Sequence, residues 1–524
     1  MTMKPSRRLP LLLLFTSSLG PLSGACDKTN PDDFHPPVRA DAGTDTGVDA
    51  GEVGPDEVTF PEGFRWGSST SAFQTETGNA QTDWGQWVAT PGKIKDGGTP
   101  DKGGPDALNH IDDDVRALKD SGQNAYRFSM EWARLYPTLA DLNAGKANAA
   151  AVAKYTELLD KLRAANIHPL VTLQHFSLPS YVSDPTKGSD PQGWERPETK
   201  DLFAKYCGLV AKLFKDKVDD WITINEPVVV ALNGYVAGAA PPGQLLATSR
   251  AFVVARAEAR AHALAYEAIH REDTVDADGD GKAAQVSIAQ NMETFHGKLE
   301  GDDADTQAAK HVEYIWNWWF VNAIVKGDWD DDFDEKYDGP NDKRADATLM
   351  NHADWLGINY YTDILVSTHD GIPIPEVGAS IVPQPLPTTR PKTDFAWDIH
   401  PEGLRSVLLR ANDYALPIAI TENGLADAAD KNRARFITEH LYQAGWAIQN
   451  GVQLRGYYYW SLMDNFEWDS GYCPKFGLYS VAADGGARTQ RGSVATYKSI
   501  IEAKKVRREA TASLPSYEPP TICN

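Results

Sequence analysis

IAITENGLA, residues 418–426, is an apolar run that leads into a carboxylate. Residues 418–421 predict a buried strand, Glu422 follows at its end, and Asn423 and Gly424 predict a turn. A carboxylate at the end of an apolar strand is partly desolvated, which costs free energy unless the charge is paired or used. The chain has 73 Asp and Glu residues, so one such position could be an accident. Its meaning depends on whether other runs end in the same way.

Eight short apolar runs alternate with amphipathic stretches such as IDDDVRALKDSG and AVAKYTELLDKLRAAN. Several of these stretches end in Gly or Asn, which favour helix C-caps. Apolar strands that are each followed by a helix indicate a parallel sheet covered by helices. Eight such units in about 440 residues predict an α/β fold, a single-domain (β/α)8 TIM barrel with long βα loops. A doubly wound open sheet is the alternative, but no Gly-rich dinucleotide fingerprint follows the first run. The runs are 64–74, 124–132, 168–175, 219–227, 284–290, 353–361, 416–424 and 454–462.

Polar or aromatic side chains stand at or near the end of these runs. In a TIM barrel, active sites lie at the C-terminal ends of the strands. A capping or loop role would explain any one of these residues, whereas eight strand ends together predict a site at the mouth of the barrel. The residues are Gln74, Arg127, Glu131, Trp132, His175, Asn225, Glu226, Asn291, Asn359, Tyr361, Glu422 and Trp460.

Glu226 and Glu422 end the fourth and seventh runs, and each has an Asn neighbour. The fourth and seventh strands lie on opposite sides of an eight-stranded barrel, so the two carboxyl groups can face each other across its mouth. Such a pair can cleave a glycosidic bond, one carboxyl donating a proton while the other attacks or activates water. Neither a Ser-His-Asp series nor an HExxH zinc motif in the sequence competes with this interpretation.

At these motifs the chain resembles the family 1 glycoside hydrolases, the β-glucosidases and their relatives. The resemblance extends from about residue 60 to residue 506, in the family's order: FPEGFRWGSSTSAFQTE, YRFSMEWARLYP, TLQHFSLP, ITINEP, LGINYY, TENG and WSLMDNFEWDSGY. QTETG and HF are similar to one branch of the family. The resemblance implies a retaining β-glycosidase, a β-glucosidase that needs no cofactor. Its implied partners are small carbohydrates, namely β-glucosides, β-galactosides, β-fucosides or cello-oligosaccharides.

The resemblance also implies roles for the two carboxyl groups. Glu226 would be the general acid/base and Glu422 the nucleophile of a double displacement, with their carboxyl groups about 5–5.5 Å apart. Glu226 must begin protonated, and we expect repulsion from the Glu422 charge to raise its pKa. Arg127 and Tyr361 match residues that keep Glu422 ionised, and Asn225 matches the group that binds the sugar 2-OH. The implied supporting set is Arg127, Asn225, Asn359 and Tyr361.

A second set matches the sugar-binding residues of the family. Gln and Glu side chains offer paired hydrogen bonds to adjacent hydroxyl groups, and Trp offers a flat apolar face. Members that act on phosphorylated sugars usually replace the Glu467 and Trp468 pair, so the intact pair argues against a phosphosugar, and the presence of Glu226 argues against a thioglucosidase. The implied substrate-binding set is Gln74, His175, Trp460 (on the aglycone side), Glu467, Trp468 and Phe476.

The first 25 residues predict a secretory signal peptide, with a basic start and an apolar stretch over 9–22. This stretch is too short to span a membrane. Small residues then precede Cys26, as in the lipobox of bacterial lipoproteins, although Ser23 stands where Leu, Val or Ile is usual. We expect acylation of Cys26 and a lipoprotein at the cell envelope. The alternative is a secreted or periplasmic protein cut near residue 25.

The acidic composition limits the partners of the chain. Residues 26–57 contain nine acids and two bases with few bulky apolar side chains, which predicts a disordered linker. A domain over 58–506 and a loosely ordered tail over 507–524 would follow. The formal net charge of −22 argues against binding to nucleic acid. The predicted contact with a membrane is through the lipid anchor alone.

Two minor features remain open in the sequence. The three cysteines beyond Cys26 allow one disulfide without identifying the pair: Cys207, Cys473 and Cys523. DADGDG (276–281) resembles the start of a calcium loop, but Ser287 stands where the loop needs Glu, and an acidic surface turn is the alternative. The candidate calcium ligands are Asp276, Asp278 and Asp280.

Two other functions would use the same residues. A transglycosylase would pass the covalent intermediate to an acceptor sugar, and a catalytically inactive surface lipoprotein would bind carbohydrate without turnover. The presence of both Glu226 and Glu422 argues against the inactive protein. We expect the loops around 186–198 and 363–395 to shape the aglycone side. The choice among glucose, galactose, fucose and mannose is not determined by the sequence.

Overall fold

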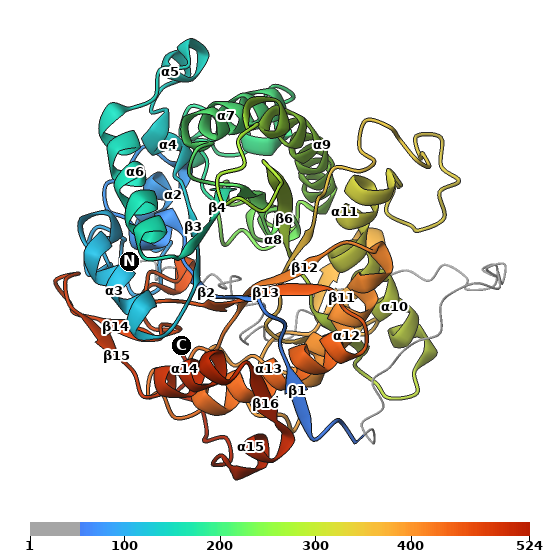
Figure 1. The fold of residues 1–524 in the computed structure, drawn as a ribbon. Helices are drawn as coiled ribbons and strands as arrows, with labels where there is room; N and C mark the ends of the chain where they lie inside the picture. Colours follow the sequence, from blue (N-terminus) through green and yellow to red (C-terminus); the bar gives the residue numbers. More distant parts are fainter. Residues whose placement is uncertain (1–52, 524) are drawn as a thin grey trace, which may run out of the picture.

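The protein forms a closed barrel of eight parallel strands in a computed structural model that describes residues 53–523 (Figure 1). Neighbouring strands around the barrel are also neighbours in the order of the chain, and every pair is parallel. All eight predicted runs supply one strand each, which confirms the (β/α)8 TIM barrel. The strands are β2 (Arg65–Ser69), β3 (Ala125–Ser129), β4 (His168–Gln174), β5 (Asp220–Asn225), β6 (Gln285–Asn291), β8 (Leu356–Asn359), β12 (Ile418–Asn423) and β13 (Leu454–Trp460).

Helices surround the barrel, as Figure 1 shows. They form where apolar residues recur every three to four positions, so that one face of each helix packs on the strands. In α3, for example, Ile111, Val115 and Leu118 are buried while Asp112 and Asp113 occupy the first turn, where the helix dipole favours acids. The covering helices are α3 (Ile111–Asp120), α6 (Ala149–Ala164), α7 (Thr199–Phe214), α9 (Thr248–Glu272), α11 (Trp319–Val321), α12 (Pro401–Ala411), α13 (Arg433–Gln449) and α14 (Ser493–Ala503).

The inside of the barrel is filled by a small apolar cluster. Six of its members come from different strands, and Trp355 directly precedes β8. They combine bulky side chains with alanines so that the cluster fits a closed ring. Gly67 of β2 contributes no side chain because a Cβ there would lie 2.7 Å from the Tyr458 ring. The cluster comprises Ala125, Leu170, Ile222, Ala289, Trp355, Ala419 and Tyr458. Because this interior is packed, a substrate can enter only at the ends of the strands.

The long loops predicted after the strands carry structure of their own. A four-stranded sheet, in the order β10-β11-β9-β7, lies outside the barrel and packs on α10 (Asp303–Glu313). It is built from the connections that follow β6 and β8. Its strands are β7 (Thr294–Gly297), β9 (Asp363–Ser367), β10 (Ile372–Ile374) and β11 (Ala379–Ile381).

The two ends of the described chain pair with each other. β1 (Glu57–Thr59) lies antiparallel to β16 (Lys505–Arg507), and α15 (Arg508–Ser513) follows. The predicted signal peptide, Cys26 and most of the predicted linker lie outside the described residues. Within residues 53–523, no helix is both long enough and apolar enough to cross a membrane.

The C-terminal segment makes specific contacts with the barrel domain. After α15 the chain runs along α13, where Tyr517 Oη donates a 2.6 Å hydrogen bond to Glu439 Oε2. It ends in a disulfide between Cys473 and Cys523, and Cys207 is free and buried. The partners in these contacts lie far away in the chain.

Candidate active site

One pocket opens at the C-terminal ends of the barrel strands. Eleven of the predicted site residues line it: Gln74, His175, Asn225, Glu226, Asn291, Tyr361, Glu422, Trp460, Glu467, Trp468 and Phe476. Arg127 and Asn359 do not line it but donate hydrogen bonds to the two carboxyl groups. Glu131 and Trp132 are not part of it: Glu131 accepts a hydrogen bond from Ala133 N, and Trp132 stacks on Tyr206. The structure therefore brings together the predicted catalytic, supporting and sugar-binding residues.

Glu226 is held in an unusual backbone conformation where β5 meets α8 (Pro227–Tyr235). Its φ of 49° is in the left-handed region, and its N–H donates a 2.7 Å hydrogen bond to Ala289 O. A non-glycine residue in this region is strained, which the surrounding structure must overcome. The conformation directs the side chain into the pocket, where Oε1 accepts hydrogen bonds from Asn359 Nδ2 at 2.8 Å and Asn291 Nδ2 at 3.2 Å.

The pKa of Glu226 is raised to about 8. Burial is the larger cause, and repulsion from Glu422 is the second. The sequence prediction named the repulsion alone, so its direction is confirmed while its main cause is corrected. Glu226 is buried in a pocket whose lining includes residues far from it in the chain, such as Trp397 and Phe476. Glu226 is therefore protonated at neutral pH and can donate a proton.

Glu422 lies in β12, where both of its carboxylate oxygens have donors. Oε1 accepts from Arg127 Nη1, and Oε2 accepts from Tyr361 Oη at 2.6 Å. The ion pair with Arg127 is almost fully buried. Burial raises the pKa of Glu422, and Arg127 and Tyr361 oppose that shift because they stabilise the ionised carboxylate. Gly424 follows without a side chain because a Cβ there would lie 1.8 Å from Trp460 O.

Arg127 connects the two carboxyl groups through one network. Its Nη2 donates to Asn225 Oδ1 at 2.6 Å, and its Nε donates to Thr172 Oγ1 at 3.1 Å. Asn225 Oδ1 also accepts from Asn359 Nδ2 at 3.1 Å, and the same Nδ2 donates to Glu226. A rigid guanidinium that is bonded on several sides fixes its carboxylate partner in one geometry. The network gives Glu422 a charged partner and gives Glu226 only neutral ones.

The predicted sugar-binding residues also line the pocket. Gln74 Nε2 donates to Phe466 O at 2.9 Å and to Glu467 Oε2 at 3.3 Å. The His175 ring stacks near Trp460 and Trp468, with centroids 5.8 and 6.2 Å away. Burial raises the pKa of Glu467 to about 8 and lowers that of His175 well below its usual value. Both side chains are therefore neutral before a ligand binds.

Two polar atoms in this region have no hydrogen-bond partner among residues 53–523. They are Glu467 Oε1 and His175 Nδ1, and both are buried. A buried polar atom without a partner costs about 1–3 kcal/mol, so such atoms are rare unless a ligand or water satisfies them. Since both residues line the pocket, hydroxyl groups of a bound sugar are suitable partners.

The pocket also contains residues that the sequence did not single out. Glu293, which follows β6, accepts a 2.8 Å hydrogen bond from Thr362 N, and burial raises its pKa. Trp316 Nε1 donates to Asn291 Oδ1 at 2.8 Å and so orients an amide bonded to Glu226. Glu293 lies two residues beyond a strand end, so a wider search at the strand ends would have found it. The additional lining residues are Phe176, Val229, Leu232, Asn233, Glu293, Trp316, Thr362, Phe395 and Trp397.

Of the two long loops that the sequence analysis singled out, one contributes to the lining of the pocket. Phe395 lies within the 363–395 loop and Trp397 lies just beyond it, and both line the pocket. Among the described lining residues, none comes from 186–198. In that loop Glu195 instead forms an ion pair with Arg250 of α9, at 2.6 Å. The loop therefore packs on the outer helices.

Known proteins resemble this chain over the part that contains the barrel. A family model described as "Glycosyl hydrolase family 1" matches residues 56–506. The chain belongs to glycosyl hydrolase family 1. As a member of this family it is a retaining glycoside hydrolase.

Relatives of this family 1 enzyme match over nearly their whole length. A β-galactosidase from Pyrococcus woesei is 32% identical, over 86% of this chain and 99% of the relative. β-Glucosidase A from Thermotoga maritima is 33% identical, over 84% of this chain and 98% of the relative. The solved structure of a family 1 β-glucosidase from Thermotoga maritima has a TM-score of 0.75 at 31% identity, covering 86% of this chain and 100% of the other.

In the candidate calcium loop of this family 1 enzyme, the carboxylates of Asp276 and Asp278 are bonded to other groups of the protein. Asp276 accepts hydrogen bonds from the N–H groups of Gly279 and Gly281, at 2.7 and 2.9 Å. Asp278 pairs with Arg65 at 3.2 Å. The residues whose oxygens gather are Asp219, Asp276 and Asp278, and Asp280 is outside this group. The carboxylate oxygens of the predicted set, Asp276, Asp278 and Asp280, therefore do not all meet at one point.

Proposed function

We propose that this family 1 enzyme is a β-glucosidase that releases terminal non-reducing β-D-glucosyl residues from short β-glucosides. Glu422 is the nucleophile and Glu226 is the general acid/base. The observation that carries the assignment is the asymmetry of their surroundings. Glu422 is bonded to a guanidinium and a phenol, which stabilise a carboxylate, whereas Glu226 has two amide donors and a pKa of about 8.

In the first step, Glu422 attacks the anomeric carbon of the bound sugar. The bond between that carbon and the glycosidic oxygen breaks as Glu226 transfers its proton to the oxygen, and the aglycone leaves as an alcohol. Arg127 and Tyr361 keep Glu422 ionised and aligned for the attack. The glycosyl ester that forms on Glu422 carries no charge.

In the second step, the change in charge prepares Glu226 to act as a base. Loss of the Glu422 charge removes the repulsion that raises the pKa of Glu226, so this pKa falls. Because burial is the larger cause of the raised pKa, part of the shift persists. Glu226 then takes a proton from water, the water oxygen bonds to the anomeric carbon, and the bond to Glu422 breaks. Both carboxyl groups return to their starting states.

The polar side of the pocket supports binding of the glycon. Glu467 Oε1 and His175 Nδ1 each lack a partner among the described residues and can bond to sugar hydroxyl groups. Gln74 is anchored next to Glu467, and Trp468 and Trp460 offer flat apolar faces. Asn225, held by Arg127, lies beside the two carboxyl groups, in a place suited to the sugar 2-OH. The pocket thus combines acceptors, donors and aromatic faces for one sugar ring.

The relatives support glucose as the glycon. Several are named as β-glucosidases or 1,4-β-D-glucan glucohydrolases, and a solved structure of the Thermotoga maritima β-glucosidase contains deoxynojirimycin. Others are named as β-galactosidases, and one from Bifidobacterium breve as a bifunctional β-D-glucosidase/β-D-fucosidase. A panel of nitrophenyl β-glycosides therefore tests the glycon. Higher kcat/KM for galactoside, fucoside or mannoside than for glucoside would contradict the proposal.

Covalent trapping tests the nucleophile. A 2-deoxy-2-fluoro-β-glucoside with a good leaving group should label the protein once, and peptide mapping should place the label on Glu422. The Glu422→Gly variant should show neither label nor turnover, while Glu293→Gln, a second buried pocket carboxyl, should still be labelled. A label on another residue, or turnover by Glu422→Gly, would overturn the assignment. Product analysis with an added acceptor sugar separates hydrolysis from transglycosylation.

We also propose that the enzyme is exported and anchored through an acylated Cys26. The disulfide between Cys473 and Cys523 supports export, because disulfides persist in oxidising compartments. Intact-mass analysis of the membrane fraction should show a lipid-modified chain that begins at Cys26. The Cys26→Ser variant should leave the membrane fraction. An unmodified soluble mature protein would contradict the anchor and support the secreted or periplasmic alternative.

A further inference from the structure

The segment after α15 lies outside the residues matched by the family model, yet it reaches the pocket loops. We call residues 514–523 the strap. The family match ends at residue 506, so the contacts of the strap are additional to the matched barrel. Along α13, Tyr517 Oη bonds to Glu439, and Glu518 N donates to Asn432 Oδ1 at 2.8 Å. These bonds hold the first part of the strap against the N-terminal half of α13.

Asp394 is one of two points at which the end of the strap is attached to the pocket loops. Its Oδ1 accepts from Thr521 N at 2.7 Å, and its carbonyl accepts from Cys523 N at 2.9 Å. Its Oδ2 accepts from Ala428 N at 2.9 Å, and its own N–H donates to Ala426 O at the same distance. Asp394 is buried, so these bonds are protected from water. One residue therefore joins the strap to the loop that follows Glu422.

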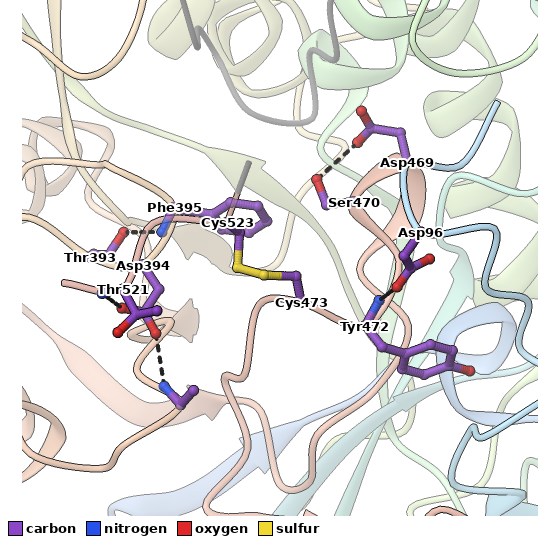
Figure 2. Close-up of a disulfide and its surroundings, with 11 residues drawn as sticks. Asp96, Thr393, Asp394, Phe395, Asp469, Ser470, Tyr472, Cys473, Thr521 and Cys523 are labelled. Carbon is purple, nitrogen blue, oxygen red and sulfur yellow. Dashed lines mark hydrogen bonds between the residues drawn. A yellow bond between two sulfur atoms is a disulfide. The ribbon is translucent and has the colours of Figure 1, made fainter. Parts of the chain in front are cut away.

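The disulfide is the second point of attachment, and Figure 2 shows it beside Asp394. It joins Cys523 to Cys473, which lies midway in the loop between Trp468 and Phe476. The same loop is held on its other side by Tyr472, whose N–H donates to Asp96 Oδ2 at 2.7 Å. The end of the strap thus fixes two separate loops.

Each attached loop contributes aromatic rings to the pocket. Phe395, Trp397 and Phe476, which we call the aromatic wall, all line it. Phe395 lies 5.6 Å from Phe476 and 4.8 Å from Trp397, measured between ring centroids. Trp397 also lies 5.4 Å from Tyr361, the residue bonded to Glu422. Trp397 Nε1 is buried without a hydrogen-bond partner in the described part of the chain, so it is available to a ligand.

We propose that the strap positions the aromatic wall and so sets how tightly the pocket binds its substrate. Phe395 directly follows Asp394, and Phe476 is three residues after Cys473, so each ring is separated from a strap attachment by a very short length of backbone. Loss of an attachment lets the loop ends separate, which misplaces the rings that must contact the sugar. Asp394, Cys473 and Cys523 are positioning residues in this account. The proposal rests on the glycosidase function proposed above.

Kinetics of single variants test this role. Cys523→Ser and Asp394→Ala should each raise KM for 4-nitrophenyl β-glucoside by about three- to tenfold while kcat changes less than about twofold, as expected for lost binding common to ground and transition states. Asp394→Asn retains one acceptor and should give a smaller rise. Tyr517→Phe is the matched control, because it removes a strap hydrogen bond to α13 that touches neither loop. Its KM should equal that of the wild type.

Reduction of the folded wild-type enzyme provides an independent test. Dithiothreitol should raise KM to the value of Cys523→Ser and should leave that variant unchanged. Calorimetric titration with deoxynojirimycin should show a weaker Kd by a similar factor, and it measures binding without turnover. If every protein failed to hydrolyse glycosides, the proposed function would be wrong, whereas the titration would still report on the strap.

Three results would overturn the role of the strap. One is an unchanged KM and Kd in folded Cys523→Ser and Asp394→Ala. Another is a fall in kcat at constant KM. The third is the same rise in KM in Tyr517→Phe, which would indicate general loosening. Circular dichroism and thermal unfolding establish that the variants are folded, and Asp394→Asn with the reduction experiment remains decisive if a harsher variant does not fold.

Discussion

Replacing Tyr361 with phenylalanine should raise the pKa that controls the acid limb of kcat/KM. Tyr361 Oη donates a 2.6 Å hydrogen bond to Glu422 Oε2 inside the buried pocket. A hydrogen bond to the ionised form of a carboxyl group lowers its pKa, so removing the donor raises it. The pKa of Glu422 is already raised by burial, and Tyr361 together with Arg127 opposes that shift. In the variant, Arg127 is the main group that still opposes the rise in the pKa of Glu422.

The structure sets the size of the effect. A hydrogen bond to a charged group contributes about 1.5–3 kcal/mol. Since one pH unit corresponds to about 1.4 kcal/mol, the acid limb should move up by about 1–2 pH units. The alkaline limb is assigned to Glu226, with a pKa of about 8, and Tyr361 does not bond to that residue. The bell-shaped profile should therefore narrow from the acid side only.

The assay is kcat/KM for 4-nitrophenyl β-glucoside between about pH 4 and pH 10, which reports the essential groups of the free enzyme. Tyr360→Phe is the matched control, since its hydroxyl bonds to His400 O at 2.7 Å and to neither catalytic carboxyl. An acid limb that stays in place or moves down would refute the reasoning. An upward shift of the alkaline limb instead would exchange the roles of Glu226 and Glu422.

Three other substitutions have definite expected outcomes. Glu226→Gln removes the proton donor and should lower kcat/KM by about 10²–10⁴-fold for substrates with poor leaving groups. The loss should be far smaller for a substrate that releases dinitrophenol, which leaves without a proton. Equal losses for both substrates would contradict the acid role. Arg127→Met leaves Glu422 as a buried charge without its cation, and it should lower the free energy of unfolding by about 3–5 kcal/mol in urea titrations. A loss under about 1 kcal/mol would refute the stabilising role of this ion pair. Replacing both Cys473 and Cys523 by Ser should lower the free energy of unfolding by about 4 kcal/mol, because the disulfide closes a loop of 50 residues in the unfolded chain. The difference should vanish when the wild type and the variant are compared under reductant.

The strands and their ends could be predicted because their signals are local. Residues 416–424 predict a strand that the structure gives as β12 (Ile418–Asn423), since a strand buried on both faces reads as an uninterrupted apolar run. The barrel then follows from the alternation of eight such runs with helices. Glu226 and Glu422 could be paired from the sequence, because the geometry of an eight-stranded barrel fixes which strand ends face each other.

The main cause of the raised pKa of Glu226 could be identified only from the tertiary structure. Repulsion between Glu226 and Glu422 could be expected once they were paired, yet burial is the larger cause of the raised pKa of Glu226. Burial depends on side chains that line the pocket from distant parts of the sequence, such as Trp316 of the helical segment Tyr314–Trp318 and Trp397. The same dependence explains why one long loop lines the pocket and the loop at 186–198 does not.

The sequence by itself determined the barrel, the two carboxyl groups at its mouth and the supporting residues on the strand ends. Each of these rests on a pattern within a few residues of the chain. Only the tertiary structure decided that Cys473 pairs with Cys523, that the strap bonds to Asp394, and that the aromatic wall is assembled from two loops. Those contacts join residues 50 or more positions apart, and their partners are selected by packing of the whole fold, which no local pattern encodes.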